Sequence, residues 1–267
     1  MNKEKKRKFI RVISIILILI GCGYIGKEYY NRAQSKKAVE AEQNISNSIA
    51  DELGLDQKQK DKEKEKKAAN EYIEKMQKEM NNEDIIGRLE FKKLGLDHLL
   101  VHSKDNNEYL NLNVKKEWFY TGSIFLDKYN KDDFSDFNSR IYGHRILDGT
   151  FFGSFKYFLD QEFVDKKKEE NFFKLTTKDG IKYYDIIAVL DVTPEMENLP
   201  TNFSQEFIDS LDKNSVVKIN STNRKITSED HLVSLVSCKP MGITHSTRRI
   251  VIIGLERNEW QRSNWGG

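Results

Sequence analysis

The chain is short of cysteine. Its 267 residues contain two, Cys22 and Cys238. Cys22 lies in an apolar N-terminal segment, whereas Cys238 lies near the end of the chain. A disulfide requires two Cα atoms closer than about 7 Å, which makes a structural bridge between these positions improbable. We therefore expect Cys238 to carry a free thiol.

An excess of charge of one sign is also lacking. The 44 lysines and arginines are offset by 42 acidic residues, which leaves a net charge of +2. This balance argues against a nucleic-acid-binding protein, because such proteins present an uncompensated basic surface. The length and the 38% share of hydrophobic residues allow one domain of ordinary size with a tail.

Residues 1–30 begin with basic side chains and continue with an apolar run at 12–25. No small-x-small cleavage site follows the run. The pattern predicts an uncleaved signal-anchor that crosses the cell membrane once, with its basic end in the cytoplasm and the rest of the chain outside. A second interpretation stays open. Residues 19–22 fit the lipobox of bacterial lipoproteins, in which Cys22 is lipidated after cleavage.

Residues 31–84 contain very little glycine and proline and are highly charged. Strong helix formers dominate, and Tyr72, Met76 and Met80 recur four residues apart. One interpretation is a helical stalk whose narrow apolar stripe packs on the following domain. The other is a solvated, partly disordered spacer.

Residues 85–267 form the expected folded domain outside the membrane. Short β-type runs alternate with turn residues, which predicts a mainly β fold, a barrel or a sandwich, rather than a parallel α/β sheet. The runs lie at 87–94, 98–103, 122–127, 172–177, 182–193, 215–221, 231–238 and 248–256. Helical patterns occur at 151–167, with Phe151, Phe155, Phe158 and Phe163 on one face, and at 204–213, with Phe207 and Leu211 four apart.

Cys238 ends the apolar run LVSLVSC and is followed by Lys239 and Pro240. A thiol at the rim of a strand is a candidate nucleophile, and a neighbouring imidazolium lowers its pKa from about 8.5. His144, at the end of a strand-like approach, can supply that group and protonate a leaving amine. Arg249 opens an apolar strand and can stabilise an oxyanion. The sequence alone shows that the three roles can be filled, not that the residues meet.

These segments resemble class B sortases. IYGHRILDGTFFGSFKYFLDQEF is similar to the histidine segment of that family, SLVSC to its cysteine strand and RRIVIIG to its arginine strand. KDNNEYLNLN and TGSIFLD are similar to its earlier strands, and SQEFIDSLDK to the helix in the loop before the cysteine strand. The resemblance covers roughly residues 85–258 in collinear order.

The resemblance implies an eight-stranded sortase barrel and a membrane-anchored cysteine transpeptidase. Cys238 would be the nucleophile, His144 the acid and base, and Arg249 the oxyanion- or substrate-orienting group. The enzyme would cleave an Asn-Pro-x-Thr-like sorting signal of a secreted protein through a thioester and transfer the protein to a peptidoglycan precursor amine. Four residues fall where the family lines its substrate groove: Asn106, Leu110, Val236 and Ser237.

The chain departs from the family pattern at Ser234 and Ser237, which replace two threonines. Serines keep the hydroxyls and lose two methyl contacts, which affects the substrate class more than the chemistry. A class B pilin polymerase with a lysine acceptor, a thiol hydrolase and a catalytically inactive membrane-tethered binding module remain alternatives.

No cofactor is implied, and we do not expect a metal site. His98 and His102 lie four apart, but the segment has the pattern of a strand edge and no convincing third ligand is near. His231 and His245 flank the cysteine strand and are expected in surface loops.

Overall fold

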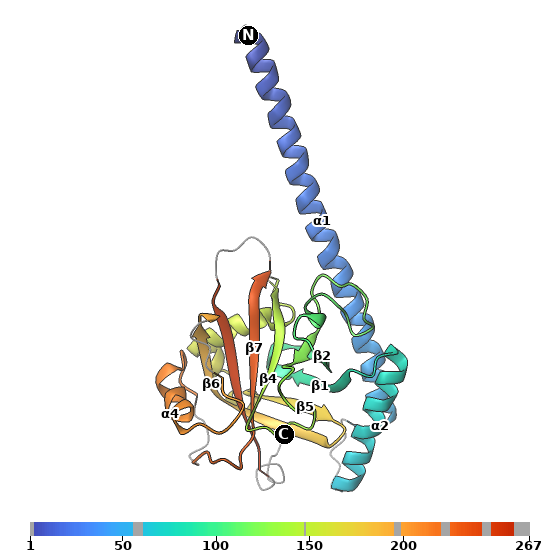
Figure 1. Ribbon diagram of the computed structural model, residues 1–267, viewed down its shortest axis with the longest axis vertical. Coiled ribbons are helices and arrows are strands. Elements are labelled where there is room, and N and C mark those ends of the chain that lie inside the picture. The colour runs from blue at the N-terminus through green and yellow to red at the C-terminus, as the bar shows by residue number, and fades with distance from the viewer. Residues whose placement is uncertain are drawn as a thin grey trace. The chain divides into compact units, whose positions relative to one another are not determined.

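The computed structural model describes residues 3–55, 61–146, 148–194, 199–219, 225–241 and 247–258; for residues 238–241 it describes the backbone alone. The chain divides into two compact units, Met1–Glu42 and Gln43–Gly267. Figure 1 shows the helices and strands and labels most of them, and the same names are used below. For Cys238, an expected site residue, the backbone alone is described. His245 lies outside the described residues.

Helix α1 (Lys3–Glu52) contains the predicted membrane segment. Its apolar side chains from Phe9 to Ile25 are exposed, and the apolar window carries no buried surface. Among the described residues this is the one helix long and apolar enough to cross a membrane. The helix can therefore serve as the expected anchor.

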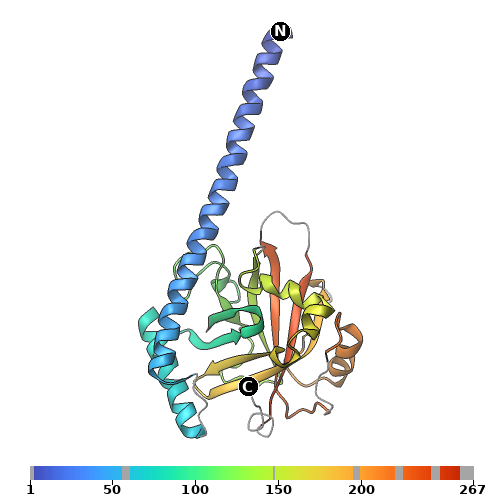
Figure 2. The ribbon, with the colours of Figure 1, turned by 180° about the vertical axis from the view of Figure 1, so that it is seen from behind.

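Helix α2 (Lys62–Met80) begins at Asp61, whose carboxylate accepts hydrogen bonds from the Glu63 and Lys64 amides. The helix lies beside the barrel (Figure 2), and its apolar stripe packs against barrel residues. Tyr72 and Met76 have no exposed surface and Met80 has 2%. The same cluster contains Leu99 and Val101 of the barrel. The interpretation as a helical stalk that packs on the domain is confirmed for this helix. Burial of the stripe stabilises the helix, since a short helix has low stability on its own.

The strands close into an eight-stranded barrel, as predicted, in the order β1-β2-β3-β4-β7-β8-β6-β5. Their bounds are β1 (Ile85–Phe91), β2 (Leu96–His102), β3 (Ile124–Leu126), β4 (Asn138–Ile146), β5 (Phe172–Thr177), β6 (Gly180–Val192), β7 (Leu232–Met241) and β8 (Arg249–Glu256). The pairs β2–β3 and β4–β7 are parallel and the others are antiparallel. Closure pairs every strand on both sides, so the barrel has no free edge.

The stretch 151–167, predicted as one helical segment, forms two short helices. A 3₁₀ helix, η3 (Phe152–Leu159), is followed by α3 (Gln161–Asp165). Asp160 separates them: its backbone is extended, and its carboxylate accepts a hydrogen bond of 2.9 Å from the Glu162 amide. The predicted apolar face is correct at Phe155 and Phe158, which have no exposed surface.

Helix α4 (Gln205–Asn214) matches the predicted short amphipathic helix. The Ser204 hydroxyl caps it by accepting from the Phe207 amide, and Phe207 and Leu211 are buried. The prediction of a strand at 215–221 is wrong for the described residues 215–219, which form no strand. There the Val216 amide donates to the Val189 carbonyl and the Ser215 hydroxyl accepts from the Val189 amide. These two hydrogen bonds join the segment to β6 without a regular pairing of strands.

Met76→Ala tests the packing of α2. The substitution removes a fully buried side chain and leaves a cavity, so we expect the free energy of unfolding to fall by about 2–4 kcal/mol. Glu79→Ala, at an exposed position of the same helix, should change it by less than about 0.5 kcal/mol. Denaturant unfolding measures both, and equal effects would show that α2 does not pack on the barrel.

Candidate active site

Three neighbouring strands carry the three predicted catalytic residues. β7 lies between β4 and β8 (Figure 1), so the strand of Cys238 separates the strands of His144 and Arg249. Tyr142 of β4 and Val251 of β8 both pair with Val236 of β7. Paired residues point to the same side of a sheet and alternate residues share that side. His144 lies two residues after Tyr142, and Arg249 lies two residues before Val251. His144 and Arg249 therefore lie on the same face of the sheet.

A β-bulge marks the point where β4 passes the cysteine. Gly143 pairs with Ser237 and Arg145 pairs with Pro240, so two residues of β7, Cys238 and Lys239, lie opposite His144 alone. Extending the β7–β8 register by two residues beyond Val236 and Val251 places position 238 across from Arg249. The fold thus brings the backbones of the three positions together. Bulges of this kind re-aim side chains beside active sites.

Gly143 makes room at this point. A Cβ at Gly143 would lie 2.8 Å from the ring of Phe152, in the 3₁₀ helix η3. A larger residue would force the ring or the strand to shift. The glycine before the histidine is therefore required by close packing under the site, a reason that the sequence does not reveal.

Among the described residues His144 makes one side-chain hydrogen bond, and this bond sets the tautomer of its neutral ring. Its Nε2 lies 2.8 Å from the carbonyl oxygen of Leu110. A carbonyl can only accept, so Nε2 carries the hydrogen and the neutral ring has its lone pair on Nδ1. Nδ1 is buried and has no hydrogen-bond partner among the described residues. The arrangement presents a base with one unoccupied nitrogen.

Burial lowers the pKa of His144, and the hydrogen bond to the Leu110 carbonyl partly offsets this by favouring the protonated ring. The imidazole is consequently neutral at physiological pH. A neutral imidazole can accept a proton at Nδ1, and once protonated it readily gives that proton up. The group is suited to shuttling a proton rather than to holding a permanent charge.

Arg249 is the first residue of β8, and Arg248 immediately precedes the strand. The Nε of Arg248 donates to the Asp191 carboxylate at 2.9 Å, and its guanidinium also contacts the Asp191 backbone carbonyl. Arg249 is half-buried, and the strand register places it on the same face of the sheet as His144. Its action together with the histidine stays a prediction.

The four residues predicted to bind substrate occupy different surroundings. Asn106 joins two loops: its Nδ2 donates to Asp127 at 3.2 Å and its Oδ1 accepts from the Lys128 amide at 2.8 Å. Leu110 holds His144 through its carbonyl. Val236 and Ser237 have no exposed surface. Their part in substrate binding stays a prediction.

The two serines of the cysteine strand have structural partners. The Ser237 hydroxyl accepts from the Ile250 amide at 2.7 Å, next to Arg249. The Ser234 hydroxyl donates to the Asn138 side chain at 2.8 Å. Both serines are completely buried. Ser237 therefore ties β7 to β8 at the position where Arg249 enters the site.

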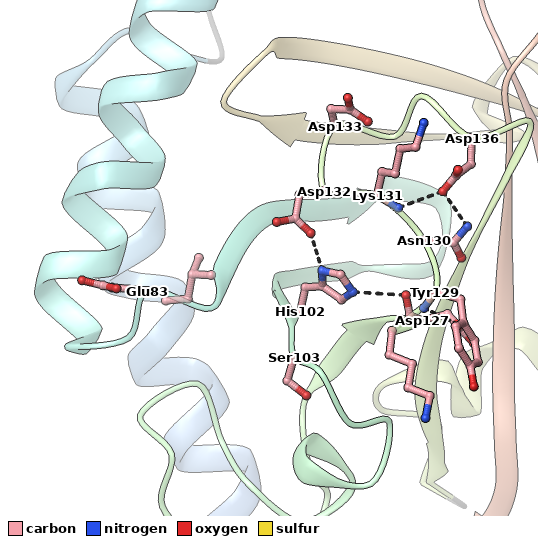
Figure 3. A network of polar contacts seen from close by, with 12 residues as sticks. Glu83, His102, Ser103, Asp127, Tyr129, Asn130, Lys131, Asp132, Asp133 and Asp136 are labelled. Carbon is pink, nitrogen blue, oxygen red and sulfur yellow. Dashed lines mark hydrogen bonds and ion pairs between the residues drawn. The ribbon is translucent and has the colours of Figure 1, made fainter.

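The other described histidines are held by structural contacts. His98 is buried and stacks on Phe151 at 4.6 Å. His102 bonds to the Asp132 carboxylate and to the Asp127 carbonyl (Figure 3), and His231 bonds to the Asp136 carbonyl. Among the described residues no group of three or more His, Cys, Asp or Glu side chains could hold a metal ion.

Comparison with known proteins points to one family, although no protein-family model matches the chain. Sortase B of Listeria monocytogenes is 31% identical over 161 residues, which are 59% of this chain and 63% of that protein. The match thus spans a little less than two thirds of the Listeria protein. Sortase B of Staphylococcus aureus is 27% identical over 177 residues, 64% of this chain and 70% of that protein.

A solved structure of the Staphylococcus aureus sortase B–substrate complex has the same fold, with a TM-score of 0.70 at 22% identity over 85% of this chain and 98% of that one. In sequence and in fold the chain is similar to class B sortases. The resemblance inferred from the histidine, cysteine and arginine segments is therefore confirmed at the level of the family and the fold.

Ser237→Ala tests the tie between β7 and β8. The substitution leaves the Ile250 amide buried without its acceptor, so we expect the free energy of unfolding to fall by about 1–3 kcal/mol. Ser139→Ala is the matched control, because the Ser139 hydroxyl is equally buried and has no partner among the described residues. Thermal or denaturant unfolding compares the two, and equal losses would refute the tie.

Proposed function

We propose that the chain is a cysteine transpeptidase that cleaves the C-terminal sorting signal of a secreted protein and transfers the protein to an amine of the cell wall. The observation that carries the proposal is the bulge by which the backbone of Cys238 lies opposite His144, with Arg249 at the start of the neighbouring strand β8. Similarity to class B sortases supports the same activity.

In the first half-reaction the Cys238 thiol gives its proton to Nδ1 of His144 and its sulfur attacks the scissile carbonyl carbon. The guanidinium of Arg249 stabilises the negative charge that develops on the carbonyl oxygen. The carbon–nitrogen bond then breaks, and the His144 imidazolium protonates the leaving amine. A thioester remains on Cys238.

In the second half-reaction an acceptor amine attacks the thioester carbon and loses a proton to Nδ1 of His144. The carbon–sulfur bond breaks, the Cys238 sulfur recovers a proton from the imidazolium, and a new amide bond joins the protein to the acceptor. The neutral His144 suits both steps, because it alternately accepts and returns one proton.

The proposed substrate and acceptor are those that the resemblance to class B sortases implies. An Asn-Pro-x-Thr-like signal would lie near Asn106, Leu110, Val236 and Ser237, with the two buried residues contributing through their backbone. A peptidoglycan precursor amine would be the acceptor. A solved structure of the Staphylococcus aureus relative in complex with its substrate, and one of a sortase B in complex with triglycine, support a peptide site and an amine site in this fold.

The same proposal places the enzyme at the cell surface. The apolar part of α1 would cross the membrane once, with the basic residues Lys5, Lys6, Arg7 and Lys8 in the cytoplasm and the catalytic domain outside. The functional division into anchor (1–30), stalk (31–84) and catalytic domain (85–267) belongs to this proposal.

The test incubates the full chain, in detergent, with a small library of quenched sorting peptides. Mass spectrometry follows the thioester and its transfer to triglycine, to a lysine peptide or to water. We expect a Cys238-linked acyl group that moves to an amine. Cys238→Ala should abolish it, and His144→Ala should lower the rate by roughly 10²–10⁴-fold.

Cys22→Ala is the matched control, because Cys22 is an exposed cysteine in α1 and should be dispensable. Preferential transfer to the lysine peptide would identify a pilin polymerase, and release to water alone a hydrolase. No acyl group with any peptide, in folded protein, would contradict the proposal and favour the inactive binding module.

A further inference from the structure

Tyr109 immediately precedes the residue whose carbonyl holds His144. It lies in the 3₁₀ helix η2 (Glu108–Leu110) and is 1% exposed. Its hydroxyl donates to the Asp84 carboxylate at 2.7 Å and accepts from Nδ2 of Asn82 at 2.8 Å. Burial, together with the Asp84 hydrogen bond, raises the pKa of Tyr109, so the phenol keeps its proton. Both hydrogen-bonding functions of the hydroxyl are satisfied.

The two partners of Tyr109 are fixed at the end of α2. The Asn82 amide donates to the Gln77 carbonyl of the last helical turn, and its side chain also donates to the Val114 carbonyl. The Asp84 amide donates to Oδ1 of Asn82, and the Asp84 carboxylate pairs with Lys116 at 2.8 Å. The phenol is thus joined to the helix that packs on the barrel.

The backbone of Tyr109 and Leu110 is held from its other side by residues 122 and 123. The Ser123 amide donates to the Tyr109 carbonyl at 3.0 Å. Gly122 has φ of +58°, and a Cβ there would lie 2.5 Å from the carbonyl oxygens of both Tyr109 and Leu110. Only glycine allows this approach. The Leu110 carbonyl consequently has little freedom to turn.

We propose that Tyr109 is a positioning residue for the reaction: clamped by Asn82 and Asp84, it fixes the Leu110 carbonyl, which keeps His144 in the Nε2–H form with Nδ1 as the proton acceptor. The inference rests on the proposed role of His144 and extends it to a residue that does not touch the substrate. The helix α2 acquires a part in catalysis through this clamp.

The tautomer decides whether His144 can work. If the Leu110 carbonyl turns away, the neutral ring loses the bond that favours a hydrogen on Nε2, and the form with a hydrogen on Nδ1 becomes populated. In that form Nδ1 cannot accept a proton. The loss therefore falls on the chemical step rather than on peptide binding.

Tyr109→Phe removes the hydroxyl and keeps the ring. Long-range ¹H–¹⁵N spectra of the full chain, labelled at its five histidines, report each tautomer, and His144→Gln assigns the signal. In the unsubstituted chain we expect the Nε2–H pattern for His144. In Tyr109→Phe we expect a mixture of both tautomers, with the His98 signal unchanged. An unaltered His144 pattern would overturn the proposal.

Kinetics with the sorting peptide give a second readout. Tyr109→Phe should lower kcat/KM by roughly ten- to a hundredfold, because misplacing a catalytic group slows the chemical step. The decrease should lie in kcat, with KM nearly constant. Asp84→Leu should act in the same direction, whereas Asp84→Asn keeps an acceptor and should recover most of the rate. A rise in KM alone, with kcat constant, would contradict a positioning role.

Tyr184→Phe is the matched control. Tyr184 is a fully buried tyrosine of β6 whose hydroxyl has no hydrogen-bond partner among the described residues. Its substitution should leave the His144 tautomer and kcat unchanged. The spectra need no substrate, so they separate two failures: a chain inactive toward every peptide refutes the transpeptidase, whereas an insensitive His144 signal refutes the clamp.

Discussion

The parallel pairing of β4 with β7 is the interaction on which the site depends. It runs from Asn138 and Leu232 to Ile146 and Met241, and the chain between the two strands contains β5, β6 and α4. A parallel pair needs a long connection, so residues far apart in sequence become neighbours only when the barrel closes. The bulge in this pair places the backbone of Cys238 and Lys239 opposite His144, and the antiparallel partner β8 begins at Arg249 on the other side of β7.

Burial and one hydrogen bond then give His144 its chemical character. Burial favours the neutral ring, and the Leu110 carbonyl selects the nitrogen that keeps its hydrogen. Nδ1 is buried and has no hydrogen-bond partner among the described residues, so it is the nitrogen left to accept a proton. The Tyr109 clamp connects this balance to α2, so the stalk helix and the reaction centre form one structural unit.

Local patterns in the sequence predicted the elements that depend on local chemistry. The strand at 172–177, the helix of Phe207 and Leu211, and the buried stripe of α2 follow from periodicity and capping. The 3₁₀ helix η3 was missed because Asp160 interrupts an apolar pattern that periodicity alone would continue. The role of the Leu110 carbonyl could not be predicted, because a backbone atom leaves no trace in residue identity and depends on tertiary contacts with Gly122 and Tyr109.

The most direct test of the account is the pH dependence of alkylation of Cys238 by iodoacetamide. It compares the full chain carrying Cys22→Ser with the same chain carrying His144→Gln in addition. The account predicts that the histidine variant reacts at least roughly tenfold more slowly at neutral pH, because the thiol loses the base that accepts its proton. Superimposable profiles for the two chains would show that His144 does not act on Cys238 and would contradict the account.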